Sequence, residues 1–152
     1  MILAIDPGNE KSAFVMGDRE VPLFEKGIMC NDEFIEKIKW FGATNPTVVI
    51  EMVASYGMAV GKTVFETVLW IGKFVRECEL NKIPVELVYR KDIKMHLCQT
   101  MRAKDTNIMQ ALKDRYGEVG TKKNPGPLYG VSKDIWSALA VATYYQDTHG
   151  GL

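Results

Sequence analysis

Residues 2–8 of the chain are Ile2-Leu3-Ala4-Ile5-Asp6-Pro7-Gly8. This stretch decides the expected fold, because four apolar residues followed by a carboxylate and Pro-Gly are typical of a buried strand that ends in a turn. A charge in such a position is unfavourable unless something compensates it. Asp6 therefore either caps the turn or, if other carboxylates converge on it, binds a divalent metal ion.

Composition and length indicate a globular protein with one domain, 1–152. Of its 152 residues, 47% are hydrophobic and 25% are charged, which is enough apolar material for a sizeable core. The apolar start is only about five residues long, shorter than the core of a secretory signal, and no run approaches the length of a membrane span. Three cysteines without metal-ligand spacing fit reduced thiols. We expect a cytoplasmic protein with no membrane partner.

The charges are unevenly distributed along the chain, although the net charge is zero. Residues 81–133 contain eleven Lys/Arg against five Asp/Glu, and the remainder is correspondingly acidic. A basic segment can bind phosphates while an acidic site binds metal ions, so this division favours a nuclease.

The hydrophobic pattern predicts five strands and five helices. Strands are expected at 2–6, 12–16, 21–28, 47–51 and 84–89, and helices at 31–41, 63–80, 90–97, 104–116 and 132–146. The Gly- and Pro-rich residues 117–130 are expected to form a mobile loop. This order is similar to that of the ribonuclease H-like fold, an α/β architecture with a mixed five-stranded sheet (three antiparallel strands, then parallel strands) flanked by helices. Such a sheet would place the first and fourth strands side by side, with Asp6 next to Glu51.

A third carboxylate, Asp134, lies near the start of the last predicted helix. An acidic residue there can simply complement the helix dipole. The small residues Ser137, Ala138 and Ala140 would, however, let this helix approach the sheet closely and bring Asp134 towards the other two acids. Three converging carboxylates make an all-oxygen site suited to Mg²⁺ or Mn²⁺, and a two-metal site hydrolyses phosphodiesters.

Four stretches, in register over nearly the whole chain, resemble the RuvC-type Holliday junction resolvases. They are Ile5-Asp6-Pro7-Gly8, Val48-Val49-Ile50-Glu51, Tyr89-Arg90-Lys91-Asp92-Ile93-Lys94 with Met101-Arg102-Ala103-Lys104-Asp105, and Asp134-x-x-Ser137-Ala138-Leu139-Ala140-Val141-Ala142. The short chain looks more like the phage and poxvirus branch than the cellular bacterial enzymes.

This resemblance implies a homodimer that makes paired, symmetric nicks in four-way junction DNA, with Mg²⁺ (or Mn²⁺ in its place), two ions per active site, and no nucleotide cofactor. Asp6, Glu51 and Asp134 match the family's metal-binding acids, and Lys104 matches a catalytic lysine close to the scissile phosphate. The family commonly has a second acid one turn along the last helix. Here Ser137 occupies that metal-site position, through branch divergence or an engineered change.

The resemblance also implies which residues contact DNA. Basic residues match backbone contacts, and Tyr56 or Met58 matches an aromatic that helps to open the junction core. The expected DNA-binding residues are Lys91, Lys94, Arg102, Lys104, Tyr56, Lys122 and Lys123.

Three other interpretations remain open. A RuvX/YqgF-like nuclease shares the fold and the acids but acts on RNA, and the basic segment at 90–104 favours the junction enzyme over it. An actin-like ATPase also begins with a strand, an Asp and a glycine, but such chains are at least twice as long. The stretch Gly57–Thr63 resembles a phosphate-binding P-loop with one residue too few between its glycines. A catalytically silent binding module is the third alternative.

Overall fold

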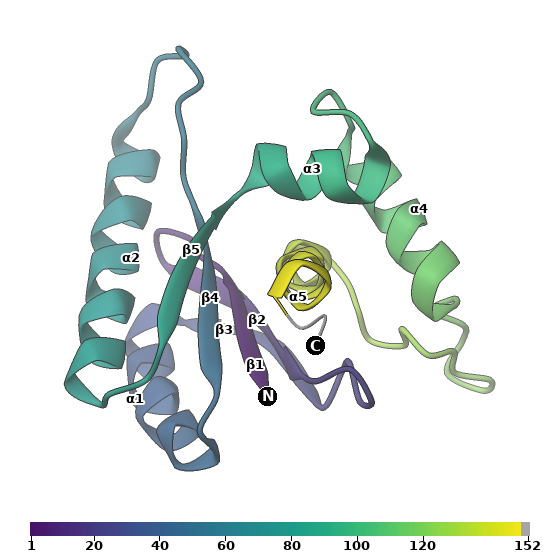
Figure 1. Cartoon of the computed structure of the whole chain (residues 1–152), viewed down its shortest axis with the longest axis horizontal. Helices are drawn as coiled ribbons and strands as arrows, with labels where there is room; N and C mark the ends of the chain where they lie inside the picture. The colour runs from purple at the N-terminus through teal and green to yellow at the C-terminus, as the bar shows by residue number, and fades with distance from the viewer. Residues whose placement is uncertain (150–152) are drawn as a thin grey trace.

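The computed structural model of the chain describes residues 1–149 (Figure 1). Its strands are β1 (Ile2–Asp6), β2 (Lys11–Gly17), β3 (Glu25–Cys30), β4 (Thr47–Met52) and β5 (Val85–Tyr89). Its helices are α1 (Asn31–Phe41), the short 3₁₀ helix η1 (Gly42–Thr44), α2 (Lys62–Leu80), α3 (Arg90–Cys98), α4 (Asp105–Tyr116) and α5 (Ile135–His149).

The five strands form one mixed sheet in the order β3-β2-β1-β4-β5. Strand β1 is antiparallel to β2 and parallel to β4, and β4 is parallel to β5. The predicted α/β architecture, with three antiparallel strands followed by parallel strands, is therefore confirmed. The β-branched and aliphatic residues of β1 and β4 explain why these two strands are the buried centre of the sheet.

Successive side chains of the central strands point to opposite faces of the sheet, and each face packs into its own apolar core. Leu3 and Ile5 face α1 and α2, whereas Ala4 and Val49 face α5 on the opposite side of the sheet. Figure 1 shows α1 and α2 on one side of the sheet and α5, seen end-on, on the other. Because side chains alternate along a strand, Asp6 follows Ala4 on the face that α5 covers.

Helix α5 is buried between the sheet and the α3–α4 pair. Its small residues Ala138 and Ala140 are almost inaccessible, and the core that they share also contains Ile93 of α3 and Leu112 of α4. A helix enclosed on several sides is apolar nearly all round, as the sequence of α5 is. Among residues 1–149, no helix is both long and apolar enough to span a membrane.

A buried polar network fixes the turn that follows Asp6. The Asn31 side chain donates a hydrogen bond to the carbonyl of Gly8 (2.9 Å) and accepts one from the Ser12 hydroxyl (2.6 Å). The Gly8 N–H in turn donates to the Ser12 hydroxyl oxygen (3.2 Å). The sequence suggests that Asn31 is the N-cap of α1, but in the structure it is the first residue of the helix. Its side chain binds the Gly8 turn instead of capping the helix.

Two predicted segments differ in the structure. Strand β3 begins at Glu25 because Asp18 accepts hydrogen bonds from the N–H groups of Glu20 and Val21 and holds the preceding residues in a turn. The expected mobile loop at 117–130 is instead a hydrogen-bonded hairpin. Leu128 anchors it, since its side chain is buried in the core beside α5.

We expect the hydrogen bonds of Asn31 to contribute to the free energy of unfolding. Asn31→Ala should lower the free energy of unfolding by about 1–3 kcal/mol, because it leaves buried polar groups without partners. Urea denaturation measures this loss. Asn81→Ala is the control, since Asn81 makes its hydrogen bonds at the exposed end of α2 and its removal should change stability by less than about 1 kcal/mol. Equal losses in the two variants would contradict the role given to the network.

Candidate active site

The carboxyl ends of β1 and β4 bring two predicted site residues together. The two strands are parallel, with Ile5 paired with Ile50, so Asp6 and Glu51 are the next residues along this register. Both lie on the face of the sheet covered by α5, because they follow Ala4 and Val49 with a period of two.

Asp134 reaches the same region from the start of α5. It lies in a turn before the helix, where its carbonyl accepts a hydrogen bond from the Ala138 N–H (3.1 Å). Asp134 is thus the N-cap residue of α5, whereas the sequence predicts it within the first helical turn. The residue before it, Lys133, has a left-handed backbone (φ 49°), a strained conformation that helps to turn the chain into α5.

The electrostatics of Asp6 show that these carboxylates interact. Burial raises the pKa of Asp6 to about 8, and the neighbouring charges of Glu51 and Asp134 add to this rise. Asp105, at the start of α4, raises the pKa further, whereas the Arg90 guanidinium partly offsets these effects. Four acidic residues from four different elements therefore surround one region of the α5 face.

Arg90 is the cation that reaches this group of acids. Its Nη1 donates hydrogen bonds to Glu51 Oε1 (3.2 Å) and, more weakly, to Ser137 Oγ (3.5 Å). Its Nη2 donates to Asp105 Oδ1. Burial raises the pKa of Glu51, and the ion pair with Arg90 opposes this rise. The guanidinium thus neutralises part of the buried negative charge.

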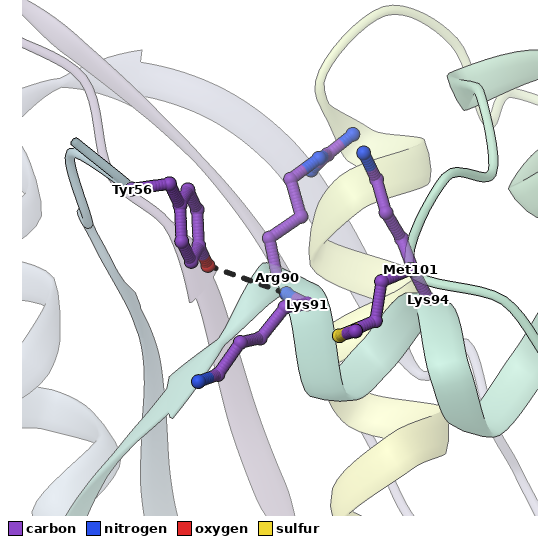
Figure 2. A pocket seen from close by; sticks show the side chains of 5 residues that line it. All are labelled: Tyr56, Arg90, Lys91, Lys94 and Met101. Atoms are coloured by element: carbon purple, nitrogen blue, oxygen red, sulfur yellow. Dashed lines mark hydrogen bonds between the residues drawn. The ribbon is translucent and has the colours of Figure 1, made fainter. Parts of the chain in front are cut away.

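A pocket of about 250 Å³ lies beside the acidic residues, between the β4–α2 loop and α3. Its lining combines one aromatic, one thioether and three basic side chains, and the residues are Tyr56, Arg90, Lys91, Lys94 and Met101 (Figure 2). Figure 2 shows Arg90 and Lys94 pointing in the same direction, while Lys91 points away from them. A basic pocket with an exposed aromatic ring suits a phosphate attached to a planar base.

The position of Tyr56 in this pocket is set by a tight turn. Tyr56 and Gly57 both have positive φ (50° and 81°), and the turn is closed by a hydrogen bond from the Met58 N–H to the Ser55 carbonyl (2.9 Å). The Lys91 N–H donates to the Tyr56 hydroxyl (3.4 Å), which links the loop to the start of α3.

Two of the four acidic residues line another pocket, of about 390 Å³, which shares Arg90 with the pocket at Tyr56. Asp105, Asp134 and Ser137 contribute to its wall, together with Trp136. Arg90 lines both this pocket and the pocket at Tyr56. Ser137 therefore faces the same region as Asp134, as their spacing on one helix predicts.

The remaining predicted residues lie on the surface around these pockets. Lys104 is the exposed N-cap residue of α4, immediately before Asp105, and its N–H donates to the Asn107 side chain (2.8 Å). Arg102 is exposed in the turn between α3 and α4. Lys122 and Lys123 lie at the tip of the hairpin beyond α4 and do not line either pocket.

The donor set suits a hard divalent cation, although the side chains are not arranged around one. Within residues 1–149, no three potential metal ligands of the Asp, Glu, His or Cys type are gathered closely enough to hold an ion. The chemistry nevertheless fits, because carboxylate oxygens are the ligands that Mg²⁺ prefers and, within the described part of the chain, Asp6 forms no ion pair with a cation. Two of the four acids, Glu51 and Asp105, are instead paired with Arg90.

The sequence pattern did not identify Arg90 and Asp105 as site residues. Arg90 directly follows β5, which is parallel to β4, so the two strands end on the same side of the sheet. This position could have predicted that Arg90 lies near Glu51. Asp105 has no comparable signal, since its approach to Arg90 depends on how α4 packs.

Two solved structures share the fold of this chain. The structure of Thermus thermophilus RuvC aligns with a TM-score of 0.65 and 17% sequence identity, over 97% of this chain and 95% of that chain. The complex of T. thermophilus RuvC with a Holliday junction substrate aligns with a TM-score of 0.66 and 17% identity, over 95% and 91%. No protein-family model and no curated protein sequence matches the chain. At this identity the likeness shows the fold, which is RuvC-like and ribonuclease H-like.

The raised pKa of Asp6 predicts how stability depends on pH without metal ions. Because its folded-state pKa (about 8) exceeds the ordinary value of 3.8, the folded protein binds more protons between these values, and stability falls as pH rises through this window. Asp6→Asn cannot ionise, so its Tm in EDTA should exceed that of the unsubstituted protein by several degrees at pH 8 and match it at pH 4.

Thermal unfolding followed by circular dichroism measures this difference. Glu20→Gln, which removes an exposed carboxylate in the β2–β3 turn, is the matched control and should show the same pH dependence as the unsubstituted protein. A Tm difference for Asp6→Asn that is the same at pH 4 and pH 8 would mean that burial and the neighbouring acids do not disfavour the ionised form of Asp6.

Proposed function

We propose that this protein is a structure-selective endodeoxyribonuclease that resolves Holliday junctions and related branched DNA by metal-dependent phosphodiester hydrolysis with paired nicks. The observation that carries the proposal is that the charges of Glu51 and Asp134 act on the buried Asp6 in a region that adjoins a basic pocket. The shared fold with RuvC, one structure of which contains a Holliday junction substrate, supports it. From the sequence resemblance we place it in the phage and poxvirus branch, acting in the cytoplasm of a bacterial or infected cell.

The three acids are proposed to hold Mg²⁺, or Mn²⁺ in its place, with two ions per site and Ser137 as a neutral neighbour. When bound, the ions activate a water molecule and stabilise the leaving oxygen. Lys104 is exposed at the N-terminus of α4, next to Asp105, and in this proposal its ammonium stabilises the charge that develops on the scissile phosphate.

The basic residues are proposed to bind DNA in two regions. Lys91, Lys94 and Tyr56 line the pocket beside the acids, where the cations would bind phosphates and the ring would stack on an unpaired base. Arg102 would bind a neighbouring phosphate along the DNA backbone. Lys122 and Lys123, at the hairpin tip, would reach a duplex arm further from the cut.

A homodimer is proposed to form through α2. Phe65, Val68 and Leu69 lie on one side of this helix, and Phe65 and Leu69 remain 63% and 60% exposed. One turn further on, Gly72 has open space where a side chain would be, so another helix can approach closely there. A two-fold axis near Gly72 would bury the stripe against its copy and give the enzyme two active sites for two symmetric nicks.

The proposed roles of the acids predict loss of cleavage without loss of binding. Asp6→Asn, Glu51→Gln and Asp134→Asn should each reduce nicking of a four-way junction in Mg²⁺ by at least about 100-fold, because each removes one metal-binding charge. Junction affinity in EDTA should fall less than about threefold. Asp114→Asn, which changes an exposed acid on α4, should leave nicking unchanged.

The same gel assay distinguishes the substrate class. It compares four-way junction, replication fork, linear duplex and structured RNA, each with Mg²⁺, Mn²⁺ or EDTA. Preferential cutting of RNA would replace the junction proposal with a YqgF-like one. Wild-type cleavage by any one of the three acid variants would remove that residue from the site.

The dimer proposal predicts that one charge on α2 separates the protomers. Leu69→Glu should convert the protein to a monomer, because it places a charge in the centre of the apolar stripe, and should abolish paired nicking. Light scattering at several concentrations measures the mass. Trp40→Glu is the control, since Trp40 is even more accessible (78% exposed) but lies on α1. A monomeric unsubstituted protein, free and on junction DNA, would rule out the dimer.

A further inference from the structure

The acids of the site face a cation that belongs to the chain itself. Arg90 Nη1 lies 3.2 Å from Glu51 Oε1 and 3.5 Å from Ser137 Oγ, and Nη2 binds Asp105. One guanidinium thus contacts side chains from β4, α4 and α5 at once. We propose that Arg90 is a tethered counter-ion that holds the acidic site in the absence of metal and is displaced when a divalent cation binds.

The geometry favours a displaceable ion pair over a permanent structural one. The Arg90 side chain is 28% exposed, and its partner Asp105 is 77% exposed, so the pairing lies at the open side of the site and not in the core. Glu51, by contrast, is only 16% exposed and supplies a charge that burial makes unfavourable without a cation. A divalent ion carries twice the charge of a guanidinium and can bind several carboxylates at once.

The structure also provides a place for the displaced side chain. Arg90 forms part of the wall between the pocket of the acids and the pocket of Tyr56, Lys91 and Lys94. A change in its side-chain torsions would move the guanidinium from the carboxylates into the pocket of Tyr56, Lys91 and Lys94 without moving the backbone of α3. There it would join two lysines at a surface suited to phosphate.

This inference rests on the proposed metal-dependent function, because it assigns Arg90 a role towards the metal. Within residues 1–149 no three potential ligands are gathered around an ion, and in this proposal the guanidinium occupies the carboxylates of Glu51 and Asp105 that a metal ion would otherwise bind. Arg90 is in this view a competitor of the metal and not a ligand or a catalytic residue.

The test is the affinity of the free protein for Mn²⁺, measured by calorimetry without DNA. Arg90→Met removes the charge without adding an oxygen ligand and should tighten Mn²⁺ binding at least tenfold. Arg90→Lys keeps the charge but loses the planar fork that reaches several partners, and should tighten it at least threefold. Arg115→Met is the matched control: it removes an arginine that pairs with Asp147, away from the site, and should leave the affinity unchanged.

A second measurement follows the unsubstituted protein directly. In ¹⁵N–¹H spectra recorded in EDTA, the Nε–H signal of Arg90, assigned by its disappearance in Arg90→Lys, should be protected by its ion pairs. Saturating Mg²⁺ should shift this signal or broaden it away, while the corresponding signal of Arg115 stays in place. This readout needs neither cleavage nor a folded Arg90→Met variant.

The outcomes separate this inference from the proposed function. Equal or weaker Mn²⁺ binding by both Arg90 variants, or an Arg90 signal that Mg²⁺ does not change, would overturn the counter-ion role even if the protein cuts junctions. Tighter binding with no nicking of any substrate would uphold the counter-ion role and defeat the nuclease proposal. No Mn²⁺ binding by any form would overturn the counter-ion role, and the absence of metal-dependent nicking as well would overturn both.

Discussion

The burial of negative charge at one edge of the sheet is the constraint on which the rest of the structure depends. The parallel pairing of β1 with β4 makes Asp6 and Glu51 neighbours, and α5 covers the face on which both lie. Burial penalises ionised carboxylates and like charges repel, so the pKa of Asp6 is raised to about 8. Buried, mutually repelling acids lower the stability of the folded protein when no cation is bound. Carboxyl groups with strongly raised pKa values are common at functional sites.

The surrounding elements hold this unfavourable arrangement in place. Helix α5 is enclosed by the sheet and by α3 and α4, so the position of Asp134 at its N-terminus is set by packing on several sides. The N-terminus of a helix also carries positive partial charge, which favours an acid there. On the opposite face of the sheet, the Asn31 network fixes the chain just after Asp6. The acids are thus supported by rigid elements, whereas the Tyr56 loop and the hairpin tip are exposed.

The sequence predicts the sheet and the neighbouring positions of Asp6 and Glu51 well, because both follow from local pattern and strand order. Four apolar residues before Asp6 and the β-branched run before Glu51 mark two buried strands, and parallel pairing then makes the acids neighbours. Contacts that depend on tertiary packing were not predictable in this way. The pairing of Arg90 with Asp105 requires the relative placement of α3 and α4, and the use of Asn31 in the Gly8 turn overrides its capping preference.

The direct passage of β5 into α3 limits how the chain can change in length. Tyr89 is both the last residue of the strand and the N-cap of the helix, so no linker separates them. One residue inserted before Arg90 would rotate its side chain by about 100° around the helix axis, away from Glu51. The rest of the loop at 53–61 is less restricted than this junction, since a side chain added at Gly57 or Gly61 would meet no neighbouring atoms. Insertions and deletions should therefore accumulate in this loop during divergence, while the β5–α3 junction keeps a constant length.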